Sequence, residues 1–180
     1  MATKSTVFKA NLQIADMDRN YYEDHTITLA RHPSETDERM MVRLLAFALN
    51  AHERLEFGQG MTNDEEADVW LKDLTGVIDL WIDVGTPDER LVRKACGRSG
   101  EVRIYTYGGR TAEIWLANNK PQFDRQSNLQ IFNLPVGQTE ALALLAQRTM
   151  HLQVLIQDGQ VTVSDNTNNV TVDPECVFGG

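Results

Sequence analysis

The segment from Val77 to Gly85 restricts the fold more than any other part of the chain. Its apolar residues alternate with other residues, which predicts a β-strand with one face on a core. The four aliphatic residues after Val77 share that face, while Asp79, Trp81 and Asp83 share the other. An ionised carboxylate beside apolar surface loses hydration. We therefore expect solvent, an arginine or a metal ion to compensate this acidic face.

The bulk properties narrow the class of protein. With 180 residues, 42% of them hydrophobic, the chain suits one globular domain over residues 1–180. A net charge of -9 argues against tight non-specific binding to a nucleic-acid duplex, yet allows a local basic patch. Cys96 and Cys176 have no metal-ligand spacing, so we expect reduced thiols. No run approaches the roughly 20 apolar residues of a membrane span, and no secretory signal is evident. We expect a cytoplasmic protein without a membrane partner.

Hydrophobic periodicity predicts strands and helices throughout the chain, and thus an α/β (α+β) fold with a mixed central sheet flanked by helices. We expect an N-terminal hairpin from residues 5–15 and 23–31, and a C-terminal hairpin from residues 150–156 and 161–163. Between them the pattern predicts, in order, a helix at 34–50, strands near 54–58, 68–71 and 77–84, a helix at 87–97, a strand at 101–107, a helix at 110–119, a strand at 128–134 and a helix at 138–147. A last strand is expected at 170–172.

Strand geometry limits what the acidic face can bind. Residues four apart on a strand lie roughly 13 Å apart, whereas Mg²⁺ or Ca²⁺ holds its oxygen ligands at about 2.0–2.6 Å. Asp79 and Asp83 therefore cannot both ligate one ion in a regular strand. A metal here needs one of them and a carboxylate from elsewhere, for which Asp68, Glu35 and Glu38 are candidates.

Several ordered blocks resemble the YaeQ family of bacterial proteins. The resemblance covers nearly the whole chain, and it rests on Arg31–Met40 (RHPSETDERM), Ile78–Glu89 (IDLWIDVGTPDE), Arg148–Gln153 (RTMHLQ) and Ile156–Gly159 (IQDG). That family is uncharacterised in function, and its fold is similar to the PD-(D/E)XK nuclease superfamily. The resemblance thus implies a restriction-endonuclease-like core of a helix, a three-stranded meander, a helix and a strand.

The nuclease resemblance also implies a set of site residues. Asp68 would be the first acid and Asp83, or alternatively Asp79, the second, together holding Mg²⁺ or Mn²⁺. The superfamily's lysine follows the second acid by two residues, where this chain has Gly85 or Trp81. Lys94 on the following helix is the available substitute. Glu38 on the first helix would be an auxiliary ligand.

Two functions remain open at this point. One is metal-dependent hydrolysis of phosphodiesters by Asp68, Asp83, Lys94 and Glu38. The other is a non-catalytic module that binds nucleic acid or a protein on the same scaffold, which the missing lysine and the acidic composition favour. Simpler interpretations also hold for single residues: the aspartates could face solvent or pair with arginines, Glu38 could serve the helix dipole, and Lys94 could belong to an exposed basic helix face.

Overall fold

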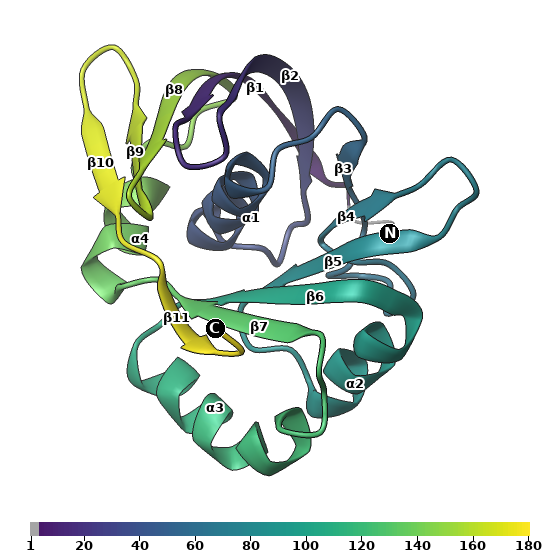
Figure 1. Cartoon of the computed structure of the whole chain (residues 1–180). Coiled ribbons are helices and arrows are strands. Elements are labelled where there is room, and N and C mark those ends of the chain that lie inside the picture. Colours follow the sequence, from purple (N-terminus) through teal and green to yellow (C-terminus); the bar gives the residue numbers. More distant parts are fainter. Residues whose placement is uncertain (1–3) are drawn as a thin grey trace. The chain divides into compact units, whose positions relative to one another are not determined.

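The computed structural model describes residues 4–180, and within them it contains four helices and two mixed sheets (Figure 1). Contacts group the chain into two compact units. Unit 1 holds the chain up to Leu49 together with Gly137–Pro174, and unit 2 holds Asn50–Val136 together with Glu175–Gly180. The predicted α/β class is confirmed, while one domain over residues 1–180 stays a prediction.

Unit 1 contains a five-stranded sheet with the order β10-β9-β8-β1-β2. Its strands are β1 (Thr6–Asp16), β2 (Tyr21–Arg31), β8 (Thr149–Gln157), β9 (Gln160–Ser164) and β10 (Asn169–Val172). Both predicted hairpins form, because β1 pairs with β2 and β8 with β9 in antiparallel fashion. They are not separate appendages, since β8 lies parallel to β1 and joins them into one sheet.

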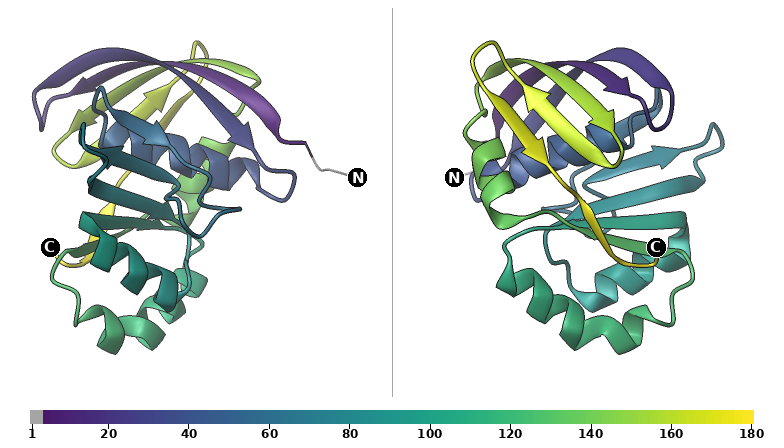
Figure 2. Two further views of the ribbon diagram at one scale, coloured as in Figure 1. Left: turned by 90° about the vertical axis from the view of Figure 1, so that its right-hand side faces the viewer. Right: turned by 60° about the vertical axis from the view of Figure 1, so that its left-hand side comes forward.

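Helix α1 (Asp37–Leu49) fills the inner side of this sheet, which curves around it in both views of Figure 2. Alternate residues of β1 and β8 are buried, and α1 is buried on nearly all sides from Met40 to Ala48. Helix α4 (Val136–Ala143) leads into β8. The core of unit 1 therefore lies between the curved sheet and α1.

The first helix begins later than its predicted start at residue 34. Residues 32–36 form a turn in which the backbone N–H of Ser34 donates to the ring of His32 at 3.1 Å. The hydroxyl of Thr36 then accepts from the backbone N–H of Arg39 at 3.1 Å, so Thr36 caps the N-terminus of α1. Two acids of the first turn still suit the helix dipole.

Unit 2 contains a six-stranded sheet with the order β11-β7-β6-β5-β4-β3. Strands β3 (Leu55–Phe57), β4 (Val69–Lys72) and β5 (Ile78–Val84) form an antiparallel meander. Helix α2 (Glu89–Arg98) then connects β5 to the parallel strand β6 (Ser99–Thr106). Strand β7 (Leu129–Asn133) extends the parallel part, and β11 (Glu175–Phe178) pairs with it in antiparallel fashion.

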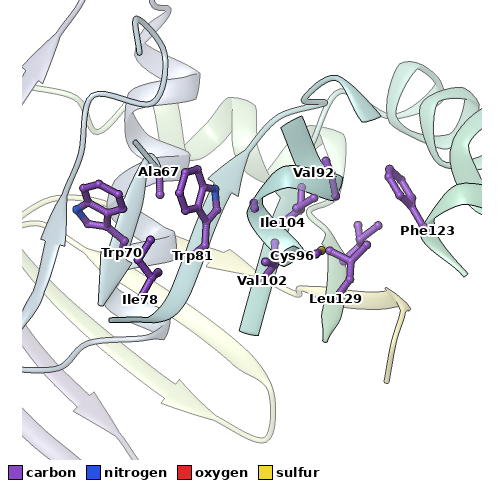
Figure 3. Packing of buried hydrophobic residues seen from close by; sticks show 12 residues of the cluster. Ala67, Trp70, Ile78, Trp81, Val92, Cys96, Val102, Ile104, Phe123 and Leu129 are labelled. Carbon is purple, nitrogen blue, oxygen red and sulfur yellow. The ribbon is translucent and has the colours of Figure 1, made fainter. Parts of the chain in front are cut away.

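Helices α2 and α3 (Arg110–Phe123) cover one face of the β5-β6-β7 region (Figure 1). A buried cluster joins the two layers, and Figure 3 shows Trp70 and Trp81 at one end of it and Phe123 at the other. Trp70 and Trp81 are directly opposite each other in the β4–β5 register and meet edge to face, with ring centroids 5.7 Å apart. The face of β5 that carries Trp81 is therefore the face toward α2.

Three smaller findings complete the fold. Strand β11 was not expected, because residues 175–178 show no clear alternation. Cys96 and Cys176 are both free thiols, as the sequence predicted. Within residues 4–180, no helix combines the length and the apolar character that a membrane crossing requires.

Candidate functional site

Asp68 and Asp83 meet across the β4–β5 pair in unit 2. Asp68 immediately precedes β4, and the register pairs Val69 with Ile82, so the two aspartates are opposite each other. The backbone N–H of Asp68 donates to Oδ1 of Asp83 at 3.2 Å. The backbone N–H of Val84 donates to Oδ2 of Asp68 at 2.9 Å. Two carboxylates from adjacent strands are therefore held side by side by backbone donors.

The two aspartates differ in their burial. Asp68 is only 3% exposed, whereas Asp83 is half-buried. The indole N–H of Trp81 donates to Oδ2 of Asp83 at 2.9 Å. Both oxygens of Asp83 therefore accept protein N–H groups, one from the backbone and one from a buried tryptophan. These donors compensate the charge of Asp83, a role expected from the sequence for solvent, an arginine or a metal ion.

A glycine-containing loop approaches the buried aspartate. A Cβ atom on Gly60 would lie 2.7 Å from the backbone nitrogen of Asp68 and 2.9 Å from its Oδ1. The backbone N–H of Gly58 also donates to the carbonyl oxygen of Asp68 at 3.0 Å. This close approach leaves no room for a larger residue at position 60, and it helps to fix Asp68.

Asp79 does not join this pair. It is exposed near the start of β5, four positions before Asp83, where the β4–β5 register shifts between Leu71 and Lys72. Four positions correspond to roughly 13 Å, so the structure brings Asp68 together with Asp83 rather than with Asp79. Gly85, at the place of the expected lysine, has a positive φ of 88° and donates its N–H to the carbonyl of Tyr105 at 2.9 Å.

Lys94 lies on α2 and forms an ion pair with Glu65. Arg98, one turn further along the same helix face, contacts the other carboxylate oxygen of Glu65 at 3.2 Å. The guanidinium carbon of Arg98 also lies over the ring of Trp81, 5.4 Å from the ring centroid, which is a cation–π contact. Lys94 is thus linked to the loop that leads into Asp68.

Glu38 lies in unit 1, where the hydroxyl of Thr139 donates to its Oε2 at 2.9 Å. Its neighbour Glu35 is buried and accepts two hydrogen bonds from Arg43, at 2.8 and 2.7 Å, and one from Arg39 at 2.7 Å. Glu35 is therefore the centre of an ionic network in unit 1. The auxiliary role that the resemblance implied for Glu38 stays a prediction.

The carboxylate oxygens of Asp68 and Asp83 are potential ligands for a divalent metal ion. Among residues 4–180, no group of three or more His, Cys, Asp and Glu side chains is arranged to hold a metal. Mg²⁺, however, is commonly held by one or two carboxylates, with water and substrate phosphates as its other ligands. Two adjacent carboxylates therefore fit Mg²⁺ or Mn²⁺ without a third protein ligand.

The sequence matches one known protein family over nearly its whole length. A family model described as YaeQ protein matches residues 1–174. The chain belongs to the YaeQ family. The "Uncharacterized protein YaeQ" of Escherichia coli K12 is 46% identical over 172 residues, covering 96% of this chain and 95% of that protein. Its counterpart from Salmonella typhi is 45% identical with the same coverage.

Two solved structures of the YaeQ family are also similar to this chain. The YaeQ protein from Xanthomonas axonopodis pv. citri is 52% identical, with a TM-score of 0.94 and coverage of 98% of this chain and 99% of that one. The YaeQ protein from Pseudomonas syringae is 35% identical, with a TM-score of 0.93 and coverage of 98% and 97%. The family and its mixed α/β fold are thereby shown.

Sequence reasoning missed two members of the site. The sequence placed Trp81 on the same strand face as Asp83 but gave it no role, whereas its indole N–H donates to Asp83. Glu65 belongs to no motif, and nothing in its spacing indicates its pairing with α2. The alternation of β5 could have suggested the first contact, whereas the second depends on tertiary structure.

Proposed function

We propose that unit 2 carries a metal-dependent phosphodiesterase centre of the nuclease class, built on Asp68 and Asp83. The observation that supports this most is the placement of both carboxylates side by side across β4 and β5. The succession of the β3-β4-β5 meander, α2 and the parallel strand β6 agrees with the order that the nuclease resemblance implies. In this proposal Asp83, rather than Asp79, is the second acid.

Each residue has a distinct role in this proposal. Asp68 and Asp83 hold Mg²⁺ or Mn²⁺ through carboxylate oxygens, and the backbone and indole donors keep those carboxylates oriented. When bound, the metal would supply Lewis acidity and a water of lowered pKa. Lys94 lies on α2, the helix that packs on the face of β5 that carries Trp81. Lys94 would contact a phosphate oxygen of the substrate, although it does not stand two residues after the second acid.

Isothermal titration with Mn²⁺ tests the metal site directly. The wild-type chain should bind Mn²⁺, and Asp83→Asn should abolish or strongly weaken binding because it removes one of the two ligands. Asp79→Asn is a matched control, since it makes the same change four residues away on the same strand at an exposed position. Equal Mn²⁺ binding by the wild type and Asp83→Asn would refute the site. Loss of binding in Asp79→Asn alone would show that Asp79, rather than Asp83, holds the metal.

A second candidate function is a non-catalytic module that binds nucleic acid or protein. It is favoured by Gly85 at the expected lysine position and by the engagement of both Asp83 oxygens with protein N–H donors. Incubation of the purified chain with labelled single- and double-stranded oligonucleotides and Mn²⁺ separates the two functions. Cleavage that is absent in Asp83→Asn supports the phosphodiesterase, and intact substrate under conditions in which Mn²⁺ binds supports the binding module.

A further inference from the structure

The basic residues of α2 fall into two groups with different partners. Arg90 and Arg93 contact acids at the start of their own helix, Asp88 at 3.3 Å and Glu89 at 3.9 Å. Lys94 and Arg98 instead converge on one carboxylate, that of Glu65, from a loop about thirty residues earlier in the chain. Only the second group therefore uses its two cations to bind a single anionic group from another segment.

The geometry at Glu65 is that of an anion-binding site. Lys94 contacts Oε1, and Arg98 donates from Nη1 to Oε2 at 3.2 Å and to the backbone carbonyl of Glu65 at 3.4 Å. Lysine and arginine bind carboxylates and phosphates through the same charge-assisted hydrogen bonds. A phosphate oxygen pair could therefore take the place of the Glu65 carboxylate with no rearrangement of α2.

This anion-binding site is joined to the aspartate pair by direct contacts. Arg98 lies over the ring of Trp81, and the indole N–H of Trp81 donates to Asp83. Glu65 itself lies three residues before Asp68 in the sequence. A phosphate held by Lys94 and Arg98 would consequently lie beside the two acids that we propose as the metal centre.

The contact is also weak enough to be exchanged. The side chain of Glu65 is 61% exposed, and those of Lys94 and Arg98 are 44% and 35% exposed. Ion pairs with this much exposure contribute little to stability, because water and salt screen them. The hydrogen bond and the charge of Lys94 lower the pKa of the Glu65 carboxyl below its ordinary value.

From these contacts we infer that Lys94 and Arg98 form a site for a backbone phosphate of single-stranded nucleic acid, which Glu65 occupies as an autoinhibitory contact in the free chain. The inference rests on the proposed function for its substrate class and adds its regulation. The loop that carries Glu65 thus acts as a latch, and a polyanion must displace it to reach the aspartate pair. Such a latch also lets a chain with a net charge of -9 keep a selective cationic site.

Fluorescence anisotropy with a fluorescein-labelled oligothymidylate, in EDTA, tests the latch on the full chain. Glu65→Gln should bind about two- to thirtyfold more tightly than the wild type, because two exposed ion pairs no longer compete with phosphate. The slope of log affinity against log salt should steepen by about 1.4, as expected for two added contacts to a single strand. Asp64→Asn is the matched control, since it makes the same charge change at the exposed neighbouring position.

A double variant separates the latch from a general charge effect. Glu65→Gln combined with Arg98→Gln should return the affinity to the wild-type value, because the freed phosphate site is then incomplete. Equal gains in Glu65→Gln and Asp64→Asn, or a gain that survives Arg98→Gln, would overturn the latch. The anisotropy measurements are made in EDTA, which removes divalent ions, so they do not depend on the metal centre. A failed Mn²⁺ titration would refute the metal centre and leave the latch standing. Equal affinities of Glu65→Gln and Asp64→Asn would refute the latch and leave the metal centre standing.

Discussion

At the residue scale, the indole of Trp81 is central to the candidate site. It donates to Asp83, lies edge to face with Trp70, and is covered by the guanidinium of Arg98. A hydrogen bond to a charged group contributes about 1.5–3 kcal/mol, more than a neutral one. Trp81 therefore couples the packing of the unit 2 core to the orientation of an acid.

Replacing Trp81 with phenylalanine should lower the free energy of unfolding by about 1–3 kcal/mol, because Asp83 loses a donor. Mn²⁺ affinity should fall as well, since Asp83 Oδ2 is no longer fixed. Trp70→Phe is the control, because it removes a similar volume without touching Asp83. Urea unfolding and Mn²⁺ titration measure both effects, and similar metal affinities for the two variants would show that Trp81 acts only in packing.

His25 provides a pH-dependent contribution in unit 1. Its Nε2 lies 2.6 Å from the hydroxyl of Tyr21, and its ring meets Phe47 edge to face at 5.4 Å. Burial lowers the pKa of His25 below 6.5, while Glu23 and Asp24 oppose the shift. The unfolded chain then binds this proton more readily than the folded chain, so stability from the neutral ring is complete above about pH 6.5 and declines at lower pH.

Urea unfolding of the wild type and His25→Gln between about pH 7 and pH 5 tests this sign. The wild type should lose stability more steeply than the variant as the pH falls, because only the wild type has the shifted imidazole. His151→Gln, at an exposed position of β8, controls for the loss of a histidine as such. Parallel curves for the wild type and His25→Gln would mean that the packing of His25 does not shift its titration.

At the element scale, most strands and helices could be predicted from their hydrophobic period. The burial of β1 and β8 alternates as the sequence indicates, and Trp81 and Asp83 of β5 share one face, as their hydrogen bond shows. The start of α1 could not be predicted, because it depends on a turn around His32 and on burial of Glu35. Strand β11 was missed because pairing with β7, rather than alternation, defines it.

Two glycines of unit 2 should respond in opposite ways to alanine. Gly60→Ala places a methyl group 2.7 Å from the backbone nitrogen of Asp68 and should cost about 1–3 kcal/mol. Gly97→Ala, in α2 with open space around its Cβ position, should stabilise by about 0.5–1 kcal/mol through helix propensity. Thermal unfolding measures both, and a stabilising Gly60→Ala would show that the loop has more room than its contacts with Asp68 imply.

At the scale of the whole molecule, the order of strands within each sheet is the part that sequence patterns leave open. Strand β8 joins β1 although about 140 residues separate their paired positions. Likewise, Asp68 and Asp83 form a pair only because β4 and β5 adopt one register, whereas a shift by one residue would turn one acid to the other face. The family resemblance, not periodicity, pointed to Asp68 as the partner, and the structure brings the two acids together.

Strand β11 belongs to unit 2, although the chain reaches it only after it has completed unit 1. Val177 and Phe178 pack against the buried cluster of unit 2. The ring centroids of Phe178 and Phe123 are 6.3 Å apart. Truncation after Pro174 should therefore destabilise unit 2 by about 1–3 kcal/mol, since partly buried side chains are lost, and should speed amide exchange in β7. Hydrogen exchange in unit 1 should change little, and removal of Gly179 and Gly180 alone is the control. Equal exchange in β7 for both truncations would show that β11 does not protect the sheet edge.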